Sequence, residues 1–383
     1  MSSYLIIMRN GSGYSGGRYC ALIFALSLVS KGHKVTILTN RKPIFLSDFK
    51  DYKELRKIRF NLNLNNFDFP CEHYDSVIVF PDLNPFSSIY EKAVLISNRN
   101  NSSLILHSFE TPNWFNSSSS IKKSSFFWSG WLFLSNFSSA IITMTRTSIK
   151  FSKTFYPKKI IHHYAYPPIN EKLATFSPTV HKEKNIFIIS RFGKYQRHKG
   201  GERLIHLFSK NFENYTFTFF GNIPSMILDR FKENAKKWNI TINHLSGVSD
   251  QVKFEYLAKC ESQIFLTSFE GYGYPPIEGL YVGTPSIVFP LEVFKETIKD
   301  SALYINNIAE IEEKYTGFIE SFDPINERNK IMARISIDNY GKNLSRILAD
   351  AKKIKKLSTF CICYIWLRYC VMYLANKLND FRK

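Results

Sequence analysis

Two glutamates flank a glycine-rich turn in the segment Phe269-Glu270-Gly271-Tyr272-Gly273-Tyr274-Pro275-Pro276-Ile277-Glu278-Gly279. An apolar run typical of a strand precedes the turn, and a run with helical spacing follows it. Glycines let the backbone turn tightly and approach a ligand, and a proline suits the first helical position. The helix N-terminus then offers N–H groups and a positive dipole end to a phosphate. We therefore predict that the turn binds phosphate through Gly271, Tyr272, Gly273 and Tyr274.

The two carboxylates suggest what else the turn binds. Glu278 falls in the first turn of the expected helix, where it could accept both hydroxyls of a ribose, as in dinucleotide folds. Glu270 lies across the turn and could hold the hydroxyls of a sugar. The alternative is that an acidic residue merely caps the helix.

A basic cluster precedes this segment in the chain, in Ser190-Arg191-Phe192-Gly193 and Arg197-His198-Lys199-Gly200-Gly201. Arg191 could bind a pyrophosphate through two hydrogen bonds of its planar guanidinium, and Lys199 could bind it as a point charge. The alternative is a solvated basic loop. Loops that follow strands of an open α/β sheet gather at the carboxyl ends of those strands. We therefore expect the basic cluster and the two glutamates to face one crevice.

Strand and helix patterns alternate through both halves of the chain, which predicts two doubly wound α/β domains. The first half opens with a strand over Tyr4–Met8 and a glycine-rich turn, which includes Gly13, Gly16 and Gly17. The other expected strands are apolar runs at 35–38, 75–80, 104–106, 140–144, 185–190, 215–220, 241–245, 263–266 and 286–289. The expected helices of the second half lie at 202–208, 231–238 and 251–259, and one opens at 277–281.

Chain length and composition set the domain plan. The 383 residues, with 44% hydrophobic and 22% charged residues, suit two globular domains. We place the boundary at Pro167-Pro168, so that 1–168 and 169–350 are Rossmann-like domains and 351–383 is a basic, apolar helical extension. The six cysteines form no regular framework and the N-terminus does not resemble a signal peptide, which favours a cytoplasmic protein.

The net charge of +19 is unevenly distributed: +11 for residues 1–168, +1 for 169–350 and +7 for 351–383. Basic surfaces suit anionic partners such as a phospholipid face, a pyrophosphate-linked substrate or nucleic acid. The alternative is a compositional bias without a role.

The motifs together resemble glycosyltransferase family four, the retaining enzymes of GT-B fold. The resemblance rests on three segments. They are Lys31-Gly32-His33-Lys34-Val35-Thr36-Ile37-Leu38-Thr39, Ser190-Arg191-Phe192 with Lys199-Gly200, and the Glu-x7-Glu segment with Gly283-Thr284-Pro285. It implies two Rossmann-like domains facing a central cleft. It also implies a transferase that takes a sugar from a nucleotide-sugar co-substrate, retains the anomeric configuration and uses no other cofactor.

The resemblance also implies roles for single residues. Positions matching Glu278 hold the ribose, those matching Glu270 face the donor sugar, and those matching Arg191 and Lys199 hold the diphosphate. A histidine that ends an N-domain strand lines the donor site, which fits His107; the alternative is a core histidine. The glycine turn with Gly13, Gly16 and Gly17 would also contact the donor. Where the family often has an acidic residue after the glycines, this chain has Arg18-Tyr19.

The expected mechanism needs no metal, because the chain has no Asp-x-Asp motif. Arg191, Lys199 and the backbone N–H groups of the glycine turn would stabilise the charge that builds on the departing diphosphate. In the family, the leaving phosphate is thought to help deprotonate the acceptor. Neither Glu270 nor Glu278 is therefore assigned as a nucleophile. His107 and Glu270 would lie next to the reacting sugar and contribute to catalysis there.

Two apolar segments suggest a membrane surface. One is the aromatic run 126–134, which follows Lys122-Lys123, and the other is 360–374, which follows the basic run 352–356. Fifteen helical residues are too short to span a bilayer, so an interfacial helix is expected for the tail. The alternatives are an interior helix for the first segment and a helix docked on the N-domain for the second.

The predicted function is glycosyl transfer to a saccharide acceptor, with a lipid-linked saccharide as one candidate, in surface polysaccharide or lipid-linked oligosaccharide synthesis. Such an enzyme would work in the cytoplasm, at the cytoplasmic face of a membrane. Two alternatives stay open: a nucleotide-sugar epimerase on the same fold, and a non-catalytic module that binds nucleotide-sugars or nucleic acid. No recognition helix or aromatic stacking motif supports nucleic-acid binding.

Overall fold

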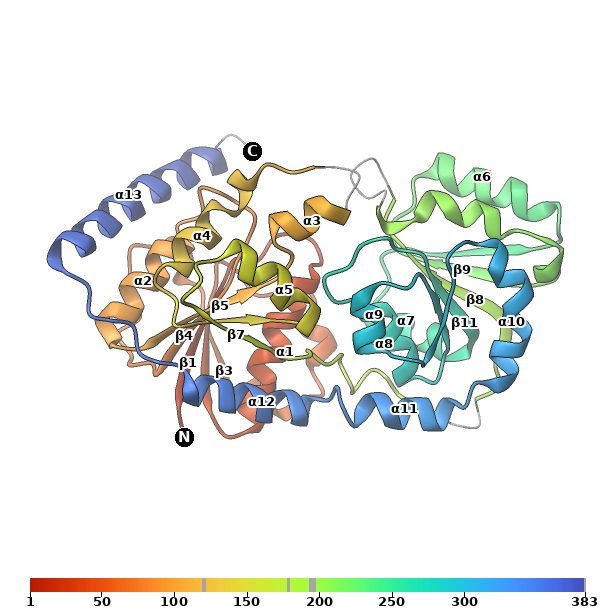
Figure 1. The fold of residues 1–383 in the computed structure, drawn as a ribbon, viewed down its shortest axis with the longest axis horizontal. Helices are drawn as coiled ribbons and strands as arrows, with labels where there is room; N and C mark the ends of the chain where they lie inside the picture. The colour runs from red at the N-terminus through yellow and green to blue at the C-terminus, as the bar shows by residue number, and fades with distance from the viewer. Residues whose placement is uncertain (119–121, 178–179, 193–197, 382–383) are drawn as a thin grey trace. The chain divides into compact units, whose positions relative to one another are not determined.

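A computed structural model describes residues 1–118, 122–177, 180–192 and 198–381, and it divides into two compact α/β units (Figure 1). The first unit comprises residues 1–115, 123–168 and 337–383. The second comprises residues 116–122 and 169–336. Each unit contains one parallel sheet with helices around it, so the two doubly wound α/β domains predicted from the sequence are confirmed.

The described residues of the first unit form a seven-stranded parallel sheet in the order β3-β2-β1-β4-β5-β6-β7. Its central strands, β1 and β4, are apolar and buried, because helices cover both faces of a parallel sheet. The strands are β1 (Ser3–Met8), β2 (Lys34–Leu38), β3 (Ile58–Asn61), β4 (Ser76–Phe80), β5 (Ser103–Ser108), β6 (Ala140–Thr143) and β7 (Ile161–Tyr164).

Helices of the first half connect these strands. The first, α1, begins directly after Ser15 and is buried along most of its length. It ends before Gly32, whose φ of 81° lies in the left-handed region that favours glycine. The helices are α1 (Gly16–Ser30), α2 (Ile89–Asn100), α3 (Pro112–Ser118), α4 (Ser129–Ser135) and α5 (Arg146–Phe155), with short 3-10 turns η1 (Leu46–Phe49), η2 (Lys53–Lys57), η3 (Asn63–Asn65) and η4 (Ser125–Trp128).

The second unit has a six-stranded parallel sheet, within the described residues, in the order β10-β9-β8-β11-β12-β13. Its core is rich in phenylalanine and isoleucine from the strands and the helices that cover them. The strands are β8 (Glu183–Ile189), β9 (Thr216–Phe220), β10 (Thr241–Leu245), β11 (Cys260–Phe265), β12 (Ser286–Val288) and β13 (Ala302–Tyr304). The helices are η6 (Gly201–Leu207), η7 (Lys210–Phe212), α6 (Ser225–Lys236), α7 (Asp250–Lys259), α8 (Tyr274–Tyr281), α9 (Glu292–Thr297), α10 (Ala309–Ser321) and α11 (Pro324–Met332).

Several elements differ from the sequence-based expectation. The segment expected as an α-helix over 202–208 is the 3-10 helix η6, and the helix expected over 231–238 begins earlier, at Ser225. Strands β3, β7 and β13 were not predicted. They lie at sheet edges, where one side of the strand has no neighbour and the apolar run is short or mixed with polar residues.

The two C-terminal helices, α12 (Ile337–Asp350) and α13 (Thr359–Phe381), belong to the first unit. The expectation that 337–350 belongs with the second domain is therefore corrected, because α12 packs against α1 (Figure 1). A Cβ on Gly341 would lie 2.5 Å from the Ser27 carbonyl oxygen, so the helices approach through a glycine. Lys31 also forms an ion pair with Asp338 at this contact.

The tail helix α13 packs against α2, which is the docked alternative for residues 360–374. Its Arg368 Nε donates to Glu91 Oε1 at 2.6 Å, and the Tyr369 side chain is fully buried. Among the described residues, the helices are too short or too polar to cross a membrane.

The aromatic run 126–134 divides between the interior and the surface. Trp128 and Trp131 are buried, and the Trp131 Nε1 donates to the Asp82 carbonyl oxygen at 2.7 Å. Phe126 and Phe127 are exposed. The interior alternative therefore holds for the part of this segment in α4.

The close contact between α12 and α1 predicts that a substitution of Gly341 lowers stability, whereas the same substitution at the open position Gly317 raises it. Gly341→Ala places a methyl group against the Ser27 backbone, and such overpacking costs about 1–3 kcal/mol of unfolding free energy. Gly317→Ala on α10 meets open space and gains helix propensity, roughly 0.5–1 kcal/mol. Urea unfolding of both variants measures the difference, and equal midpoints would contradict the close packing of α12.

Candidate functional site

The glycine-rich turn lies at the carboxyl end of β11 and opens α8 as predicted. Gly273 immediately precedes α8 with a φ of 84°, and a Cβ there would lie 2.3 Å from the Phe294 ring. Pro275 lies at the start of the helix, where its missing N–H costs nothing. The Gln263 Nε2 of β11 donates to the Pro275 carbonyl oxygen at 2.8 Å, which fixes the helix start against the strand.

Lys199 and Glu270 meet at the carboxyl end of the second sheet. The Lys199 Nζ lies 2.6 Å from Glu270 Oε1, and the two side chains are 18% and 13% exposed. The sequence predicted that these residues would face one crevice, and the structure brings them into direct contact. A partly buried ion pair of this kind restrains the direction of each side chain.

Backbone contacts hold Lys199 beside the glutamate turn. The His198 carbonyl oxygen accepts from the Ser268 N–H at 2.8 Å and from the Thr267 hydroxyl at 3.1 Å. Gly200 has a φ of 74°, and a Cβ there would lie 2.0 Å from the Leu266 carbonyl oxygen. The position of Lys199 is therefore set by backbone packing and does not depend on its flexible side chain alone.

Glu278 takes part in a second, more deeply buried ion cluster. Its Oε1 lies 2.8 Å from the Lys253 Nζ, which also lies 3.2 Å from Asp250 Oδ1. Lys253 and Asp250 are in the first turn of α7, where the Ser249 side chain caps the helix. The sequence analysis missed both residues, because an Asp and a Lys three apart are usual on any exposed helix and nothing in their spacing marks burial.

The burial of this cluster alters its titration. Burial raises the pKa of Glu278, while the Lys253 ammonium opposes the rise. Burial also tends to lower the pKa of Lys253, but the carboxylates of Glu278 and Asp250 outweigh this effect and the net pKa is raised. Lys253 therefore stays protonated and directs one oxygen of Glu278.

The other residues predicted in this half occupy the same edge of the sheet. Arg191 is exposed two residues after β8, and the Ser190 hydroxyl donates to the Lys199 carbonyl oxygen at 3.1 Å. Gly271 is buried, and the Tyr272 and Tyr274 rings lie 5.1 Å apart. Gly193 and Arg197 lie outside the described residues.

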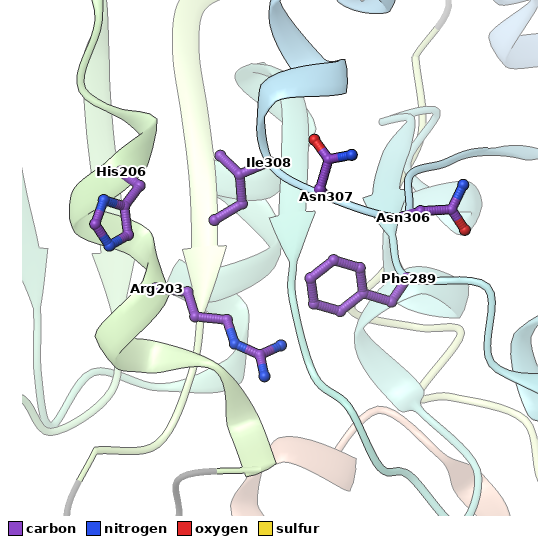
Figure 2. A pocket seen from close by; sticks show the side chains of 6 residues that line it. All are labelled: Arg203, His206, Phe289, Asn306, Asn307 and Ile308. Carbon is purple, nitrogen blue, oxygen red and sulfur yellow. The ribbon is translucent and has the colours of Figure 1, made fainter.

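A hollow that the sequence did not predict opens at the carboxyl ends of β12 and β13 (Figure 2). Its volume is about 450 Å³. The Arg203 guanidinium lies over the Phe289 ring at 5.4 Å, a cation–π contact on one wall. The remaining lining residues are His206, Asn306, Asn307 and Ile308. The hollow shares its sheet edge with the Lys199–Glu270 pair.

His107 lies in β5 in the core of the first unit. Its side chain is fully buried and stacks on Phe80 with ring centroids 4.4 Å apart, and its Nε2 lies 3.8 Å from Cys20 Sγ. Burial lowers the pKa of His107 to about 3, so the ring is neutral. These surroundings favour the core-histidine alternative, and the predicted donor contact of His107 stays a prediction.

The N-terminal glycine turn meets α1 at its first residues. Gly13 is exposed and Gly16 begins the helix, while a Cβ on Gly17 would lie 3.0 Å from the Phe109 ring. Arg18, where the resembling family often has an acidic residue, points inward and donates to the Phe80 and Pro81 carbonyl oxygens at 3.1 and 3.2 Å. Arg18 therefore holds the end of β4. The donor contacts of the three glycines stay predictions.

No three His, Cys, Asp or Glu side chains gather at a potential metal site in the described part of the chain. Among the described residues, the side chains of Arg191 and Lys199 and the N-terminus of α8 are positive groups at this edge of the sheet. Together they offer charge to an anion with several oxygens.

Residues 171–339 match the family model described as "Glycosyl transferases group 1". The matched region contains Arg191, Lys199, Glu270 and Glu278. It also contains the cluster partners on α7.

Two curated relatives are similar over part of their length. The O-antigen chain mannosyltransferase RfbU of Salmonella typhimurium is 26% identical over 175 residues, covering 37% of this chain and 49% of the relative. The alpha-1,3/1,6-mannosyltransferase ALG2 of Dictyostelium discoideum is 25% identical over 268 residues, covering 61% of this chain and 59% of the relative. The chain thus spans about half to three fifths of the relatives it matches.

Among solved structures, HepE of Anabaena in complex with UDP and glucose is similar with a TM-score of 0.67 at 13% sequence identity. The alignment covers 91% of this chain and 100% of that one. The likeness shows the fold, and the GT-B fold class predicted from the sequence is confirmed.

The buried cluster predicts that Lys253→Met strongly destabilises the chain. The substitution leaves the carboxylates of Glu278 and Asp250 buried without their cation, which costs about 3–5 kcal/mol of unfolding free energy. The control Lys314→Met removes a solvent-exposed partner of Glu310 and should change stability little. Urea unfolding at pH 7.5 measures both, and similar midpoints would show that the cluster is solvated in solution.

The burial of His107 predicts that the free energy of unfolding decreases at acid pH. Its pKa of about 3 in the fold lies below the unfolded value of about 6.5, so unfolded chains bind the proton first and stability falls as the pH drops below 6.5. Between pH 7.5 and pH 5 this site should cost roughly 2 kcal/mol. In His107→Gln the loss of unfolding free energy over that range should shrink by this amount. An unchanged loss would mean that the ring contacts solvent.

Proposed function

We propose that this chain is a glycosyltransferase that moves a sugar from a nucleotide-sugar to a saccharide acceptor. The observation that carries the proposal is the convergence of Lys199, Glu270 and Glu278 on one edge of the second sheet. The match of residues 171–339 to group 1 glycosyl transferases supports it. So does the GT-B fold.

The diphosphate of the donor would lie between the basic loop and the start of α8. Glu270 already balances Lys199, and exposed Arg191 adds a positive charge at this edge. The N–H groups of the glycine turn add a fixed dipole. These groups would stabilise the charge that grows on the diphosphate as the sugar departs, and they are in place before the reaction.

Glu278 would hold the ribose of the donor nucleotide. A carboxylate accepts hydrogen bonds from both ribose hydroxyls when its oxygens are held in position. The ammonium of Lys253, at 2.8 Å, supplies that restraint and opposes the rise that burial causes in the pKa of Glu278. Glu270, restrained by Lys199, would accept from the hydroxyls of the sugar.

We also propose that the transfer is metal-independent and retains the anomeric configuration, as in family four. The cations and the helix N-terminus supply the positive charge that a metal would otherwise provide. Neither Glu270 nor Glu278 is assigned as a nucleophile, because the carboxylate of each is already paired to a lysine.

The acceptor is proposed to be a saccharide of a surface polysaccharide or a lipid-linked oligosaccharide. The relatives are named as an O-antigen chain mannosyltransferase and an alpha-1,3/1,6-mannosyltransferase, which supports acceptors of this class. A lipid-linked acceptor would bring the chain to the cytoplasmic face of a membrane.

The donor site predicts a loss of binding and transfer in Lys199→Ala. UDP-, GDP-, ADP- and dTDP-sugars are screened for a rise in melting temperature, since a ligand stabilises the folded state by mass action. Transfer from the stabilising donor is then assayed with excess chelator. Lys199→Ala should abolish the thermal shift and reduce transfer about 100-fold or more.

The matched control is Lys232→Ala, an exposed lysine of α6 in the same unit, which should behave as wild type. Full transfer by Lys199→Ala would contradict the proposed site. Complete loss of wild-type transfer in chelator would contradict metal independence. Conversion of the donor to an isomeric nucleotide-sugar without acceptor would indicate an epimerase instead.

A further inference from the structure

The tail helix α13 has an inner face that is firmly docked on the first unit. Ile365 and Tyr369 are fully buried, and the Tyr369 hydroxyl donates to the Asn66 carbonyl oxygen at 3.2 Å. Arg368 pairs with Glu91, whose side chain is 1% exposed. These contacts fix the rotation of the helix about its own axis, and so they fix which side chains face away from the protein.

The outer face of α13 is a continuous apolar stripe. Its members recur at alternating intervals of four and three residues, which places them on one side of a helix. They are Phe360, Tyr364, Leu367, Val371 and Leu374, with exposures of 85%, 51%, 66%, 55% and 60%. A soluble helix normally presents polar residues on this side, so the stripe requires a partner or an apolar medium.

The stripe carries no charge, and a basic segment leads into it. Arg368 is the one charged residue between 357 and 376, and it points inward to Glu91. Immediately before the helix, the side chains at 352, 353, 355 and 356 are exposed lysines. Ile354 between them is buried, and its N–H donates to the Ser102 carbonyl oxygen at 3.1 Å. The lysine segment is thus anchored on the same unit as the stripe.

Two exposed aromatic residues belong to segments near the C-terminal part of α13. The Asn376 Nδ2 donates to the Phe86 carbonyl oxygen at 2.8 Å, which ties the helix to the loop after β4. Phe86 and Phe126 are 40% and 53% exposed, and their rings lie 5.8 Å apart. Aromatic side chains are enriched where proteins meet the interface of a bilayer.

We propose that this surface docks on an anionic lipid bilayer, with α13 lying in the plane of the membrane. The docking surface comprises the outer stripe of α13, the lysines at 352–356 and the Phe86–Phe126 pair. From 360 to 374 the stripe extends about 21 Å, shorter than a hydrocarbon core of about 30 Å. With its inner face held by the protein, the helix can insert one face only, which is the interfacial mode.

A lipid surface fits the charges better than a second copy of the chain. Two copies joined through their stripes would bring two lysine segments and two basic first units together. Residues 351–379 contain no acidic residue that could balance them. An anionic bilayer supplies both the apolar layer for the stripe and the negative headgroups for the lysines. This inference does not rest on the proposed function, because vesicle binding needs neither donor nor acceptor.

The test is co-sedimentation of the full chain with vesicles of phosphatidylcholine alone or with 30% phosphatidylglycerol. Wild type should bind the anionic vesicles at least tenfold more tightly than the neutral ones, since each lysine near such a surface contributes about fivefold. The double variant Leu367→Glu with Val371→Glu should lose most of its binding to both the neutral and the anionic vesicles. Replacing the lysines at 352, 353, 355 and 356 by Gln should remove the preference for anionic vesicles.

The matched control is Met226→Glu with Ile325→Glu, two exposed apolar residues of the second unit, which should bind as wild type. Circular dichroism checks that each variant is folded, and all four substituted apolar side chains are exposed. The proposal is overturned if wild type does not sediment with vesicles, or if the α13 variant binds as well as the control. It is also overturned if the wild type is a dimer without lipid, the α13 variant is a monomer, and neither protein binds vesicles.

Discussion

The parallel pairing of β8 with β11 is the constraint on which the candidate site depends. Gln263 and Ile264 of β11 pair with Phe187 and Ile188 of β8, so both strands end at the same edge of the sheet. The loops that follow carry Lys199 and Glu270, which are 71 residues apart in the chain and 2.6 Å apart in space. The two charges meet because the paired strands bring the segments that follow them to the same place.

Two ion clusters lie at this edge, and they differ in how far solvent reaches them. The Lys199–Glu270 pair retains some exposure and can exchange part of its contact for a ligand. The cluster of Glu278, Lys253 and Asp250 is nearly dry, so its charges depend on one another and cannot separate without a large cost. A rigid carboxylate and an adjustable one thus lie on either side of the glycine turn. This division suits a site that must hold a nucleotide firmly while a sugar leaves it.

The return of the chain to the first unit shapes the remaining surface. Because α12 packs against α1 and α13 is held to α2 by the ion pair of Arg368 and Glu91, the tail is part of the first unit's surface. The same ion pair between Arg368 and the buried Glu91 leaves five apolar side chains of α13 facing outward. Docking on the protein and contact with a bilayer were alternatives for the tail, and the two faces of α13 allow both together.

The sequence by itself determined the fold class, the glycine turn and its two glutamates, and the basic loop. Apolar runs, glycines and prolines act over a few residues, so their signals survive without knowledge of the fold. It could not reveal Lys253, because burial of a helix residue depends on which face the sheet covers. Nor could it decide between the two readings of His107, since the same strand end is compatible with a ligand contact or with a stack of aromatic rings. The burial of His107, the assignment of 337–350 and the two faces of α13 were decided by tertiary structure, because packing between segments far apart in the chain sets which side of each element meets solvent.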